Sequence, residues 1–381
     1  MRSKAGGCVF RAFAGALALL TGCGIAVGPT PHSVYGHVMK LVPRTLVGQP
    51  VSALQVGSAS WLTLRTATGV TVQALSSSPI VSYAIPLRSV QCSGAGTLRR
   101  VGSFAVVTGC TDVWILRPKG WVQVALPAAL TTPQVLTGTG AHWWFLAIGT
   151  GASGNEAVTL WTTLNAGASW SRVATSGNGL TLAPPGAPPY FGDKTGLSID
   201  TNNQLWITGA TMALGGLWLY RGGKSGTTWA AERPSVPYGW GLAQLVSYPP
   251  RFVGSTGYLP IAVDSKRFAG IALYTRTNAR RQWKYATSVS TPAVVTGKWH
   301  WTVTMAHSVW LTAADKLWVS RSGPLYWRPL LTLPPHWIFT SVSFAGADGV
   351  LVAVRSSNSS STRVFAVWHT HDGGRTWSSM R

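Results

Sequence analysis

Acidic residues are scarce in this chain of 381 residues. Nine Asp and Glu stand against 31 Lys and Arg, which gives a formal net charge of +22 and a pI near 10.7. Charged residues make up 10% of the chain, where about 25% is usual. One interpretation is a basic surface that attracts anionic polymers or lipid headgroups. The other is an acidic habitat, where carboxylates would lose their charge and their pairing. The bases are scattered, in runs no longer than Arg99-Arg100 and Arg280-Arg281, which favours the habitat interpretation.

The same scarcity argues against most hydrolases. Glycoside hydrolysis needs two carboxylates that flank one bond, yet the two glutamates, Glu156 and Glu232, fall in a loop and beside an outer strand. No G-x-S-x-G motif stands between a strand and a helix. His369 and His371 have no third metal ligand nearby in sequence, so we interpret them as solvated turn residues. We predict no catalytic residue, no metal and no cofactor. With no binding motif, we also predict no nucleic-acid partner.

The first residues predict export. Arg2, Lys4 and Arg11 precede an apolar run from Ala12 to Leu20, which is too short to span a bilayer. The run ends in Leu20-Thr21-Gly22-Cys23, which resembles the lipobox of bacterial lipoproteins. This resemblance implies cleavage after residue 22 and a lipid on Cys23, and an ordinary secretory signal is the alternative. We predict a signal peptide at 1–22 and a lipid-anchored tether at 23–49, on the outer face of the cell membrane.

Cysteine is also rare, with four residues in the whole chain. Cys8 would leave with the signal and Cys23 would carry lipid, so Cys92 and Cys110 remain. In an exported protein such a pair predicts a structural disulfide, with a metal site as the weaker alternative.

No window shows a sustained helical period with caps, so the chain is predicted to be all-β. Its clearest motif is Thr370-x-Asp372-x-Gly374-x-Thr376-Trp377, which predicts a hairpin turn. Degenerate copies place an aromatic residue nine positions before a Trp: Asn165-x-Gly167 before Trp170, Asn278 before Trp283, and Ser322 before Trp327. The closing tryptophans at 121, 170, 229, 283, 327 and 377 are 49, 59, 54, 44 and 50 residues apart. This period suits one four-stranded propeller blade.

The motif resembles the Asp-box turn of sialidase-type β-propellers and of the photosystem II assembly-factor family. The resemblance implies a propeller of four-stranded antiparallel blades over residues 50–381. We predict seven blades, one of them (50–86) without the motif, while six or eight stay possible. In sialidases such turns lie away from the catalytic centre, and the arginine signature of that family finds no match. In the tether, Val42–Val47 could instead pair with the last blade and remove its exposed edge.

The predicted function is a monomeric, non-catalytic binding or assembly module for a protein or glycan at the cell envelope. A sialidase-like glycoside hydrolase and a purely structural envelope component are the alternatives. Most of the 20 tryptophans are expected to serve packing. Tyr238, Trp240 and Trp337 fall in connections between blades, where packing explains them least. We predict that these three aromatic residues mark a ligand face.

Overall fold

The computed structural model describes residues 44–66, 69–75, 81–86, 95–152, 155–177, 186–189, 192–211, 216–277, 282–291, 299–321, 326–355 and 362–380. The chain divides into two compact units, Met1–Gly36 and His37–Arg381, and every described residue belongs to the second. That unit is all-β apart from a one-turn 3-10 helix, η1 (Pro133–Val135). The predicted signal peptide, Cys23 and most of the predicted tether lie outside the described residues.

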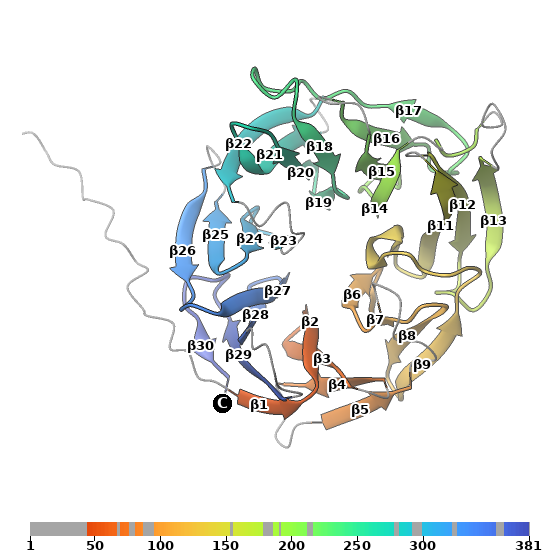
Figure 1. The fold of residues 1–381 in the computed structure, drawn as a ribbon. Coiled ribbons are helices and arrows are strands. Elements are labelled where there is room, and N and C mark those ends of the chain that lie inside the picture. The colour runs from red at the N-terminus through yellow and green to blue at the C-terminus, as the bar shows by residue number, and fades with distance from the viewer. Residues whose placement is uncertain are drawn as a thin grey trace, which may run out of the picture. The chain divides into compact units, whose positions relative to one another are not determined.

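The strands of the second unit form six hydrogen-bonded antiparallel sheets arranged in a ring (Figure 1). Five sheets are single blades of four or five strands, and the nine-stranded sheet holds two blades that meet at the single pair Ala210↔Val246, so seven blades can be traced. The fold is a β-propeller, as the repeat predicted. In order, the blades are β2–β5 (Gln49–Val56, Ala59–Arg65, Val70–Ala74, Val81–Ile85); β6–β9 (Leu98–Val101, Phe104–Thr108, Asp112–Arg117, Gly120–Ala125); β10–β13 (Leu136–Thr139, His142–Ala152, Asn155–Thr163, Ser171–Ser176); β14–β17 (Asp193–Ile199, Leu205–Ala210, Trp218–Gly222, Trp229–Ala231); β18–β22 (Gln244–Ser247, Arg251–Val253, Thr256–Asp264, Ala269–Thr277, Lys284–Ser290); β23–β26 (Trp299–Val303, Val309–Ala313, Lys316–Ser320, Arg328–Thr332); and β27–β30 (Trp337–Ala345, Asp348–Arg355, Thr362–Thr370, Ser378–Ser379) with β1 (Arg44–Val47).

The ring closes through its ends. Strand β1 pairs with β29 from Arg44↔Phe365 to Val47↔Thr362, while β30 pairs with the other end of β29. The outer edge of blade 7 is therefore shared between the N-terminal and C-terminal strands. This bears out the alternative that residues before 50 complete the last blade, and Arg44–Val47 belong to the propeller rather than to the tether expected over 23–49. Closure covers an edge that would otherwise present unpaired backbone groups.

The first strand of each blade is its inner strand. Two features of the inner strands could not be predicted from the sequence. Strands β6 and β10 are four residues each, too short to show an alternation. In blade 5, the inner strand is broken into β18 and β19 by Pro249-Pro250. Neither proline has an N–H to donate to the ladder, so pairing with β20 stops at Tyr248 and resumes at Arg251.

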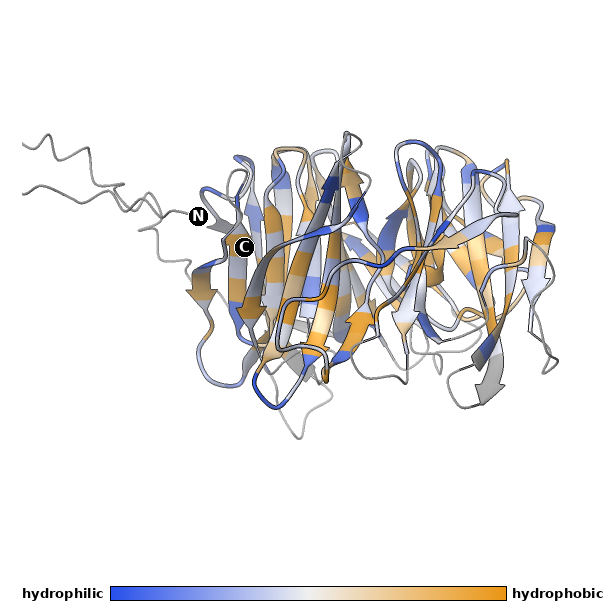
Figure 2. Ribbon diagram, turned by 90° about the horizontal axis from the view of Figure 1, so that it is seen from above, coloured by the Kyte–Doolittle hydropathy of each residue, from blue (hydrophilic) through white to orange (hydrophobic). Residues whose placement is uncertain are grey.

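The cores lie between neighbouring blades, and tryptophan fills them. In three seams, a Trp on the second strand of one blade meets the closing Trp of the next blade edge to face. These pairs are Trp61–Trp121 (ring centroids 6.0 Å apart), Trp206–Trp283 (5.5 Å) and Trp310–Trp377 (5.8 Å). Hydrophobic residues follow the strands, and hydrophilic residues gather in the turns at both ends (Figure 2). Packing therefore accounts for the periodic tryptophans.

Candidate functional site

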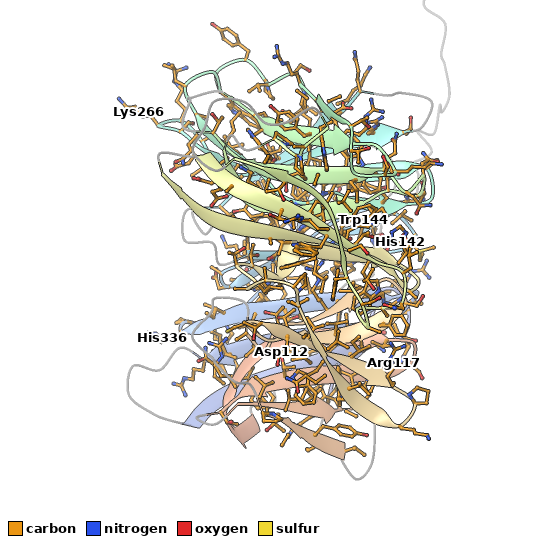
Figure 3. The ribbon with its side chains drawn as sticks, turned by 90° about the vertical axis from the view of Figure 1, so that its right-hand side faces the viewer. Asp112, Arg117, His142, Trp144, Lys266 and His336 are labelled. Atoms are coloured by element: carbon orange, nitrogen blue, oxygen red, sulfur yellow. The ribbon has the colours of Figure 1, made fainter. Side chains whose placement is uncertain are left out.

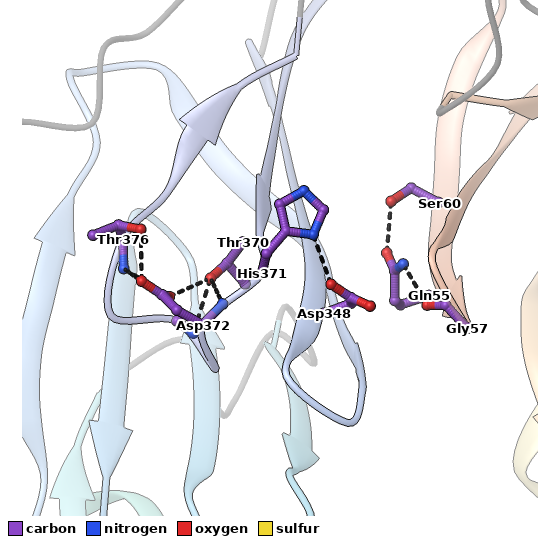
Figure 4. Close-up of polar contacts among 9 residues, drawn as sticks. Gln55, Gly57, Ser60, Asp348, Thr370, His371, Asp372 and Thr376 are labelled. Carbon is purple, nitrogen blue, oxygen red and sulfur yellow. Dashed lines mark hydrogen bonds and ion pairs between the residues drawn. The ribbon is translucent and has the colours of Figure 1, made fainter.

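The turn after β29 is built around one carboxylate (Figure 4). Asp372 Oδ1 accepts hydrogen bonds from the Arg375 amide at 2.8 Å and the Thr376 amide at 2.9 Å. Its two oxygens also accept from the hydroxyls of Thr370 at 2.8 Å and Thr376 at 2.6 Å. Burial alone would raise the pKa of Asp372, but the bonds from Thr376, Thr370 and Arg375 outweigh it and lower the pKa to about 2.

Glycine is required in this turn. Gly374 has a φ of +83°, and an added Cβ would meet the ring of Trp310 in blade 6. Its amide donates to Thr370 Oγ1 at 3.0 Å. The turn thereby places Trp377 in the seam with blade 6. Its task is structural.

The turn after β12 repeats this network without a charge. Asn165 Oδ1 accepts from the Thr163 hydroxyl at 2.7 Å and the Ser169 amide at 2.9 Å, and the Gly167 amide donates to Thr163 Oγ1 at 3.0 Å. Trp170 reaches back to blade 2, where its Nε1 donates to the Ala125 carbonyl. Of the remaining predicted turns, Asn278 and Ser322 lie outside the described residues. Their closing residues Trp283 and Trp327 are buried and half-buried in seams.

The predicted ligand face survives only in part. Trp337 is 6% exposed and belongs to the hydrophobic core between blades 6 and 7, so it cannot contact a ligand; this prediction is wrong. Trp240 is half-buried, stacked on Phe268 with ring centroids 5.2 Å apart. Tyr238 is fully exposed. Trp337 is the first residue of β27 rather than part of a connection between blades, and its ring packs in the core.

The two glutamates do not form a catalytic pair. Glu232 accepts from Arg221 at 3.0 Å and Arg276 at 3.4 Å on the outer side of blades 4 and 5. Glu156 accepts from the Lys194 amide at 2.7 Å at the start of β14. Burial lowers the pKa of the Lys194 amine to about 8, although Glu156 and Asp193 raise it in part. Among the hydrogen bonds of the described residues, neither glutamate contacts a tyrosine, as the sialidase mechanism would require.

His369, His371 and Cys110 are the remaining side chains that the sequence raised as candidate ligands or disulfide partners. His371 Nδ1 lies 2.6 Å from Asp348 Oδ1, and its ring meets His369 at 4.9 Å. Over the described ranges, no group of three potential ligands comes together. Cys110 is disulfide-bonded, whereas Cys92 lies outside the described ranges, so their pairing stays a prediction. No described helix has the length and apolar character to cross a bilayer.

A different cluster stands out on the inner strands, which lie nearest the centre of the ring (Figure 1). These strands carry one acidic residue, Asp193, at the first position of β14. They carry four permanent bases: Arg99 and Arg100 on β6, Lys194 on β14, and Arg251 on β19. The other eight acids lie on second to fourth strands or in turns. Lys194 is buried and its amine donates to the Gly192 and Glu156 carbonyls, so the three arginines remain as the bases that can face solvent from these strands, and the strands carry no pair of carboxylates.

Arg251 is exposed to solvent, yet burial lowers its pKa to about 10. The surface of the side chain is open to solvent, while the protein atoms around it disfavour the charge of the guanidinium. Its Nη1 donates to Thr302 Oγ1 at 2.9 Å, and the guanidinium carbon lies 5.1 Å from the centroid of Trp301. Both partners belong to β23, so blade 6 fixes the orientation of a side chain from blade 5.

The charge of Arg251 reaches Arg99, which lies on β6 of another blade. Burial, and then repulsion from Arg251, lower the pKa of Arg99 to about 10. Its Nη1 donates to the Pro133 carbonyl, at the start of η1 in blade 3. Nearby on β23, burial lowers the pKa of the exposed His300 to about 4, which keeps this ring neutral at ordinary pH. The sequence showed Arg99 only as half of a short basic run, and nothing in it placed Arg99 near Arg251.

Two hollows of the surface lie elsewhere. One of about 280 Å³ is lined by Thr111, Asp112, Gln123 and Ala125 on the outer part of blade 2, and one of about 480 Å³ lies between β13 and Thr227. Figure 3 shows the two faces of the ring, with Lys266 and His336 on one and Arg117 and His142 on the other. Neither hollow is lined by an aromatic ring beside a basic side chain, as Trp301 and Arg251 are on the inner side. We therefore place the candidate site on the inner strands.

Comparison with known proteins supports the fold. No protein-family model matches the chain, and no curated protein matches its sequence. The extracellular domain of a hybrid two component system from B. thetaiotaomicron matches with a TM-score of 0.50 and 11% identity, over 90% of this chain and 40% of that one. YCF48 from Cyanidioschyzon merolae matches with a TM-score of 0.45 and 12% identity, over 85% and 98%. A chain of the mitotic checkpoint complex matches with a TM-score of 0.49 and 11% identity, over 92% and 98%.

The present chain thus spans about two fifths of the B. thetaiotaomicron domain that it resembles. At these identities the likeness shows the fold alone. The chain is a β-propeller, and what it does has to be argued from its own residues.

Proposed function

We propose that this chain is an exported, lipid-anchored propeller of the Asp-box type that binds a protein or glycan ligand at the outer face of the cell membrane and catalyses no reaction. The observation that carries the proposal is the composition of the inner strands, which hold four bases and a single acid at one end. Propellers bind ligands where inner strands and connecting turns converge. A basic face without paired carboxylates can hold a ligand but cannot hydrolyse a glycoside.

The engagement of the glutamates supports a non-catalytic role. Glu232 serves an ion-pair cluster on the outer side, and Glu156 holds the start of β14. The networks at Asp372 and Asn165 support membership of the Asp-box class, because the same acceptor position closes both turns. Acid-poor composition fits an acidic exterior, where few carboxylates remain to be protonated.

Two measurements test this proposal. Purified full-length protein should sediment with cell-envelope fragments in a saturable way and should release no sugar from sialosides. Sialoside hydrolysis that disappears in Glu156→Gln or Glu232→Gln would instead establish the hydrolase. Absence of saturable sedimentation would contradict the binding function.

Lipid anchoring can be tested with one variant and a matched control. Cys23→Ser should move the protein from the membrane fraction to the soluble fraction, because the proposed lipid site is lost. Cys8→Ser, within the proposed signal peptide, should leave the distribution unchanged. Membrane association that persists in Cys23→Ser would show that the chain is held in another way.

A further inference from the structure

We infer that Arg99 of β6 and Arg251 of β19 together form an oxyanion site on the inner face of the ring, which takes a carboxylate, sulfate or phosphate group of the ligand. The inference deepens the proposed binding function by naming the chemistry that the inner strands recognise. It depends on where the two guanidinium groups lie, what holds them, and what is missing around them.

The two arginines lie at matching depths in blades 2 and 5. Arg99 pairs with Val106, two residues before the strand ends at Val101, and Arg251 pairs with Tyr258, two residues before the strand ends at Val253. The inner segments between these blades converge closely: a Cβ added to Gly196 of β14 would collide with Pro249 of blade 5 and with Gln134 of blade 3. Arg99 donates to Pro133, the neighbour of Gln134, and Arg251 lies two residues after Pro249, so both arginines border the segment around Gly196. The charge of Arg251 lowers the pKa of Arg99 in this arrangement.

Protein contacts orient both guanidinium groups but use only some of their hydrogen-bond donors. A guanidinium has five N–H donors in a planar fork. Arg251 gives one donor to Thr302, and Arg99 gives one to the Pro133 carbonyl. Contact with the ring of Trp301 also restricts the plane of Arg251. The hydrogen bonds of the described residues occupy no other donor of either guanidinium, so each can bind a planar or tetrahedral oxyanion at two points, the geometry that arginine favours.

Nothing on the inner strands neutralises this pair. The one acid there, the exposed Asp193, starts β14 three residues before Gly196, and its charge raises the pKa of the neighbouring Lys194. Two like charges that repel in a partly desolvated space raise the free energy of the empty protein. A bound oxyanion would reverse the sign of that interaction.

The experiment measures oxyanion binding to the full-length protein by isothermal titration with sulfate, phosphate and acetate. Arg99→Gln and Arg251→Gln should each weaken binding about tenfold or more, because each removes charged hydrogen bonds. Arg117→Gln is the matched control, since Arg117 also lies over an aromatic ring, at 4.4 Å from the centroid of Phe104, but at the end of β8. It should bind like the wild type and thereby account for the general attraction of a basic surface.

Stability provides a second measurement. If the arginines served only to brace the blades, Arg99→Gln with Arg251→Gln would lower the urea midpoint. The inference predicts an unchanged or higher midpoint, because repulsion is relieved, together with a smaller stabilisation by added oxyanion than in the wild type. Preference for acetate would assign a carboxylate, and preference for phosphate or sulfate would assign a tetrahedral group.

Three results would overturn the inference: no oxyanion binding by the wild type, equal binding by the double variant, or loss of binding in Arg117→Gln alone. Envelope sedimentation separates this inference from the proposed function. Retention that is unchanged in the double variant would overturn the oxyanion site and leave the binding module standing. If the wild type binds oxyanions but does not sediment with the envelope, the oxyanion site stands and the proposed binding function is overturned.

Discussion

Asp372 offers the sharpest test of how the turns hold the propeller together. Its carboxylate accepts from two backbone amides and two hydroxyls within one turn. Replacement by alanine removes all of these acceptors at once. The turn would then lose the constraint that places Trp377 against Trp310 in the seam between blades 6 and 7. Asp372→Asn keeps an amide oxygen in the same position, as Asn165 does in the turn after β12.

The magnitude follows from the bonds and their exposure. Hydrogen bonds to a charged acceptor contribute about 1.5–3 kcal/mol each in a buried setting, but both amides of this turn are exposed to water. We therefore expect Asp372→Ala to lower the free energy of unfolding by about 2 kcal/mol in total. Asp372→Asn should cost about half as much, since the charge is lost but the acceptor remains.

The pH dependence has a definite sign. The folded-state pKa of Asp372 is lowered from 3.8 to about 2, so the charged form stabilises the fold above pH 3.8. That contribution is lost as pH falls through about 2. The difference in unfolding free energy between wild type and Asp372→Asn should be largest above pH 4 and should shrink below it. Urea unfolding followed by circular dichroism measures it.

Asp264 provides a control for the removal of an acid. It is exposed and ends β20, and its side chain makes no hydrogen bond among those of the described residues. Asp264→Ala should leave the unfolding free energy within about 0.5 kcal/mol of wild type. Equal effects of the alanine changes at positions 372 and 264 would refute the claim that this turn braces the seam.

Three further predictions concern the seams, the closure and a neutral histidine. Trp206→Ala should lower the free energy of unfolding by about 3–5 kcal/mol, because Trp206 is fully buried between blades 4 and 5. Its control, Tyr326→Ala, removes a half-exposed ring and should change the free energy by less than about 0.5 kcal/mol. Unfolding in guanidinium measures both variants. A chain that begins at Gly48 lacks β1, exposes the edge of β29, and should show a lower unfolding midpoint and more light scattering than the full chain. The folded-state pKa of His300 is lowered from 6.5 to about 4, so on acidification the unfolded chain takes up the proton before the folded chain does. Wild-type stability should therefore fall from pH 6.5 to about 4 and level off below that. Urea midpoints of His300→Gln should not show this fall.

Much of the fold could be predicted from the sequence because its signals are local. The second strands β7, β20 and β28 are short runs of β-type residues that stand out locally in the sequence. Each of these strands is apolar and bounded by turn residues, and the closing tryptophans fix the repeat. The short inner strands gave weaker signals, and their exact pairing depends on neighbours far away in sequence.

The candidate site could not be predicted in the same way. The sequence predicts Trp337 in a connection between blades, yet it begins β27 and its ring lies in the core. Arg99 and Arg251 are separated by about 150 residues. Only closure of the ring brings blades 2 and 5 to a common centre, so no pattern in either segment could announce the pair. Sites of this kind are properties of the assembled repeat.

The charged groups of the turns and of the inner strands differ in how folding affects their charge, and this difference favours the inner strands as the binding site. In the turn after β29 a carboxylate has all of its partners, and its pKa falls because the folded state stabilises its charge. On the inner strands the opposite holds: burial and mutual repulsion lower the pKa of Arg99, so folding disfavours the charge that it nevertheless keeps. Groups that oppose stability and have no structural partner for their charge are typical of binding sites. If the double arginine variant were both less stable and equally able to bind oxyanions, this contrast would have no functional meaning.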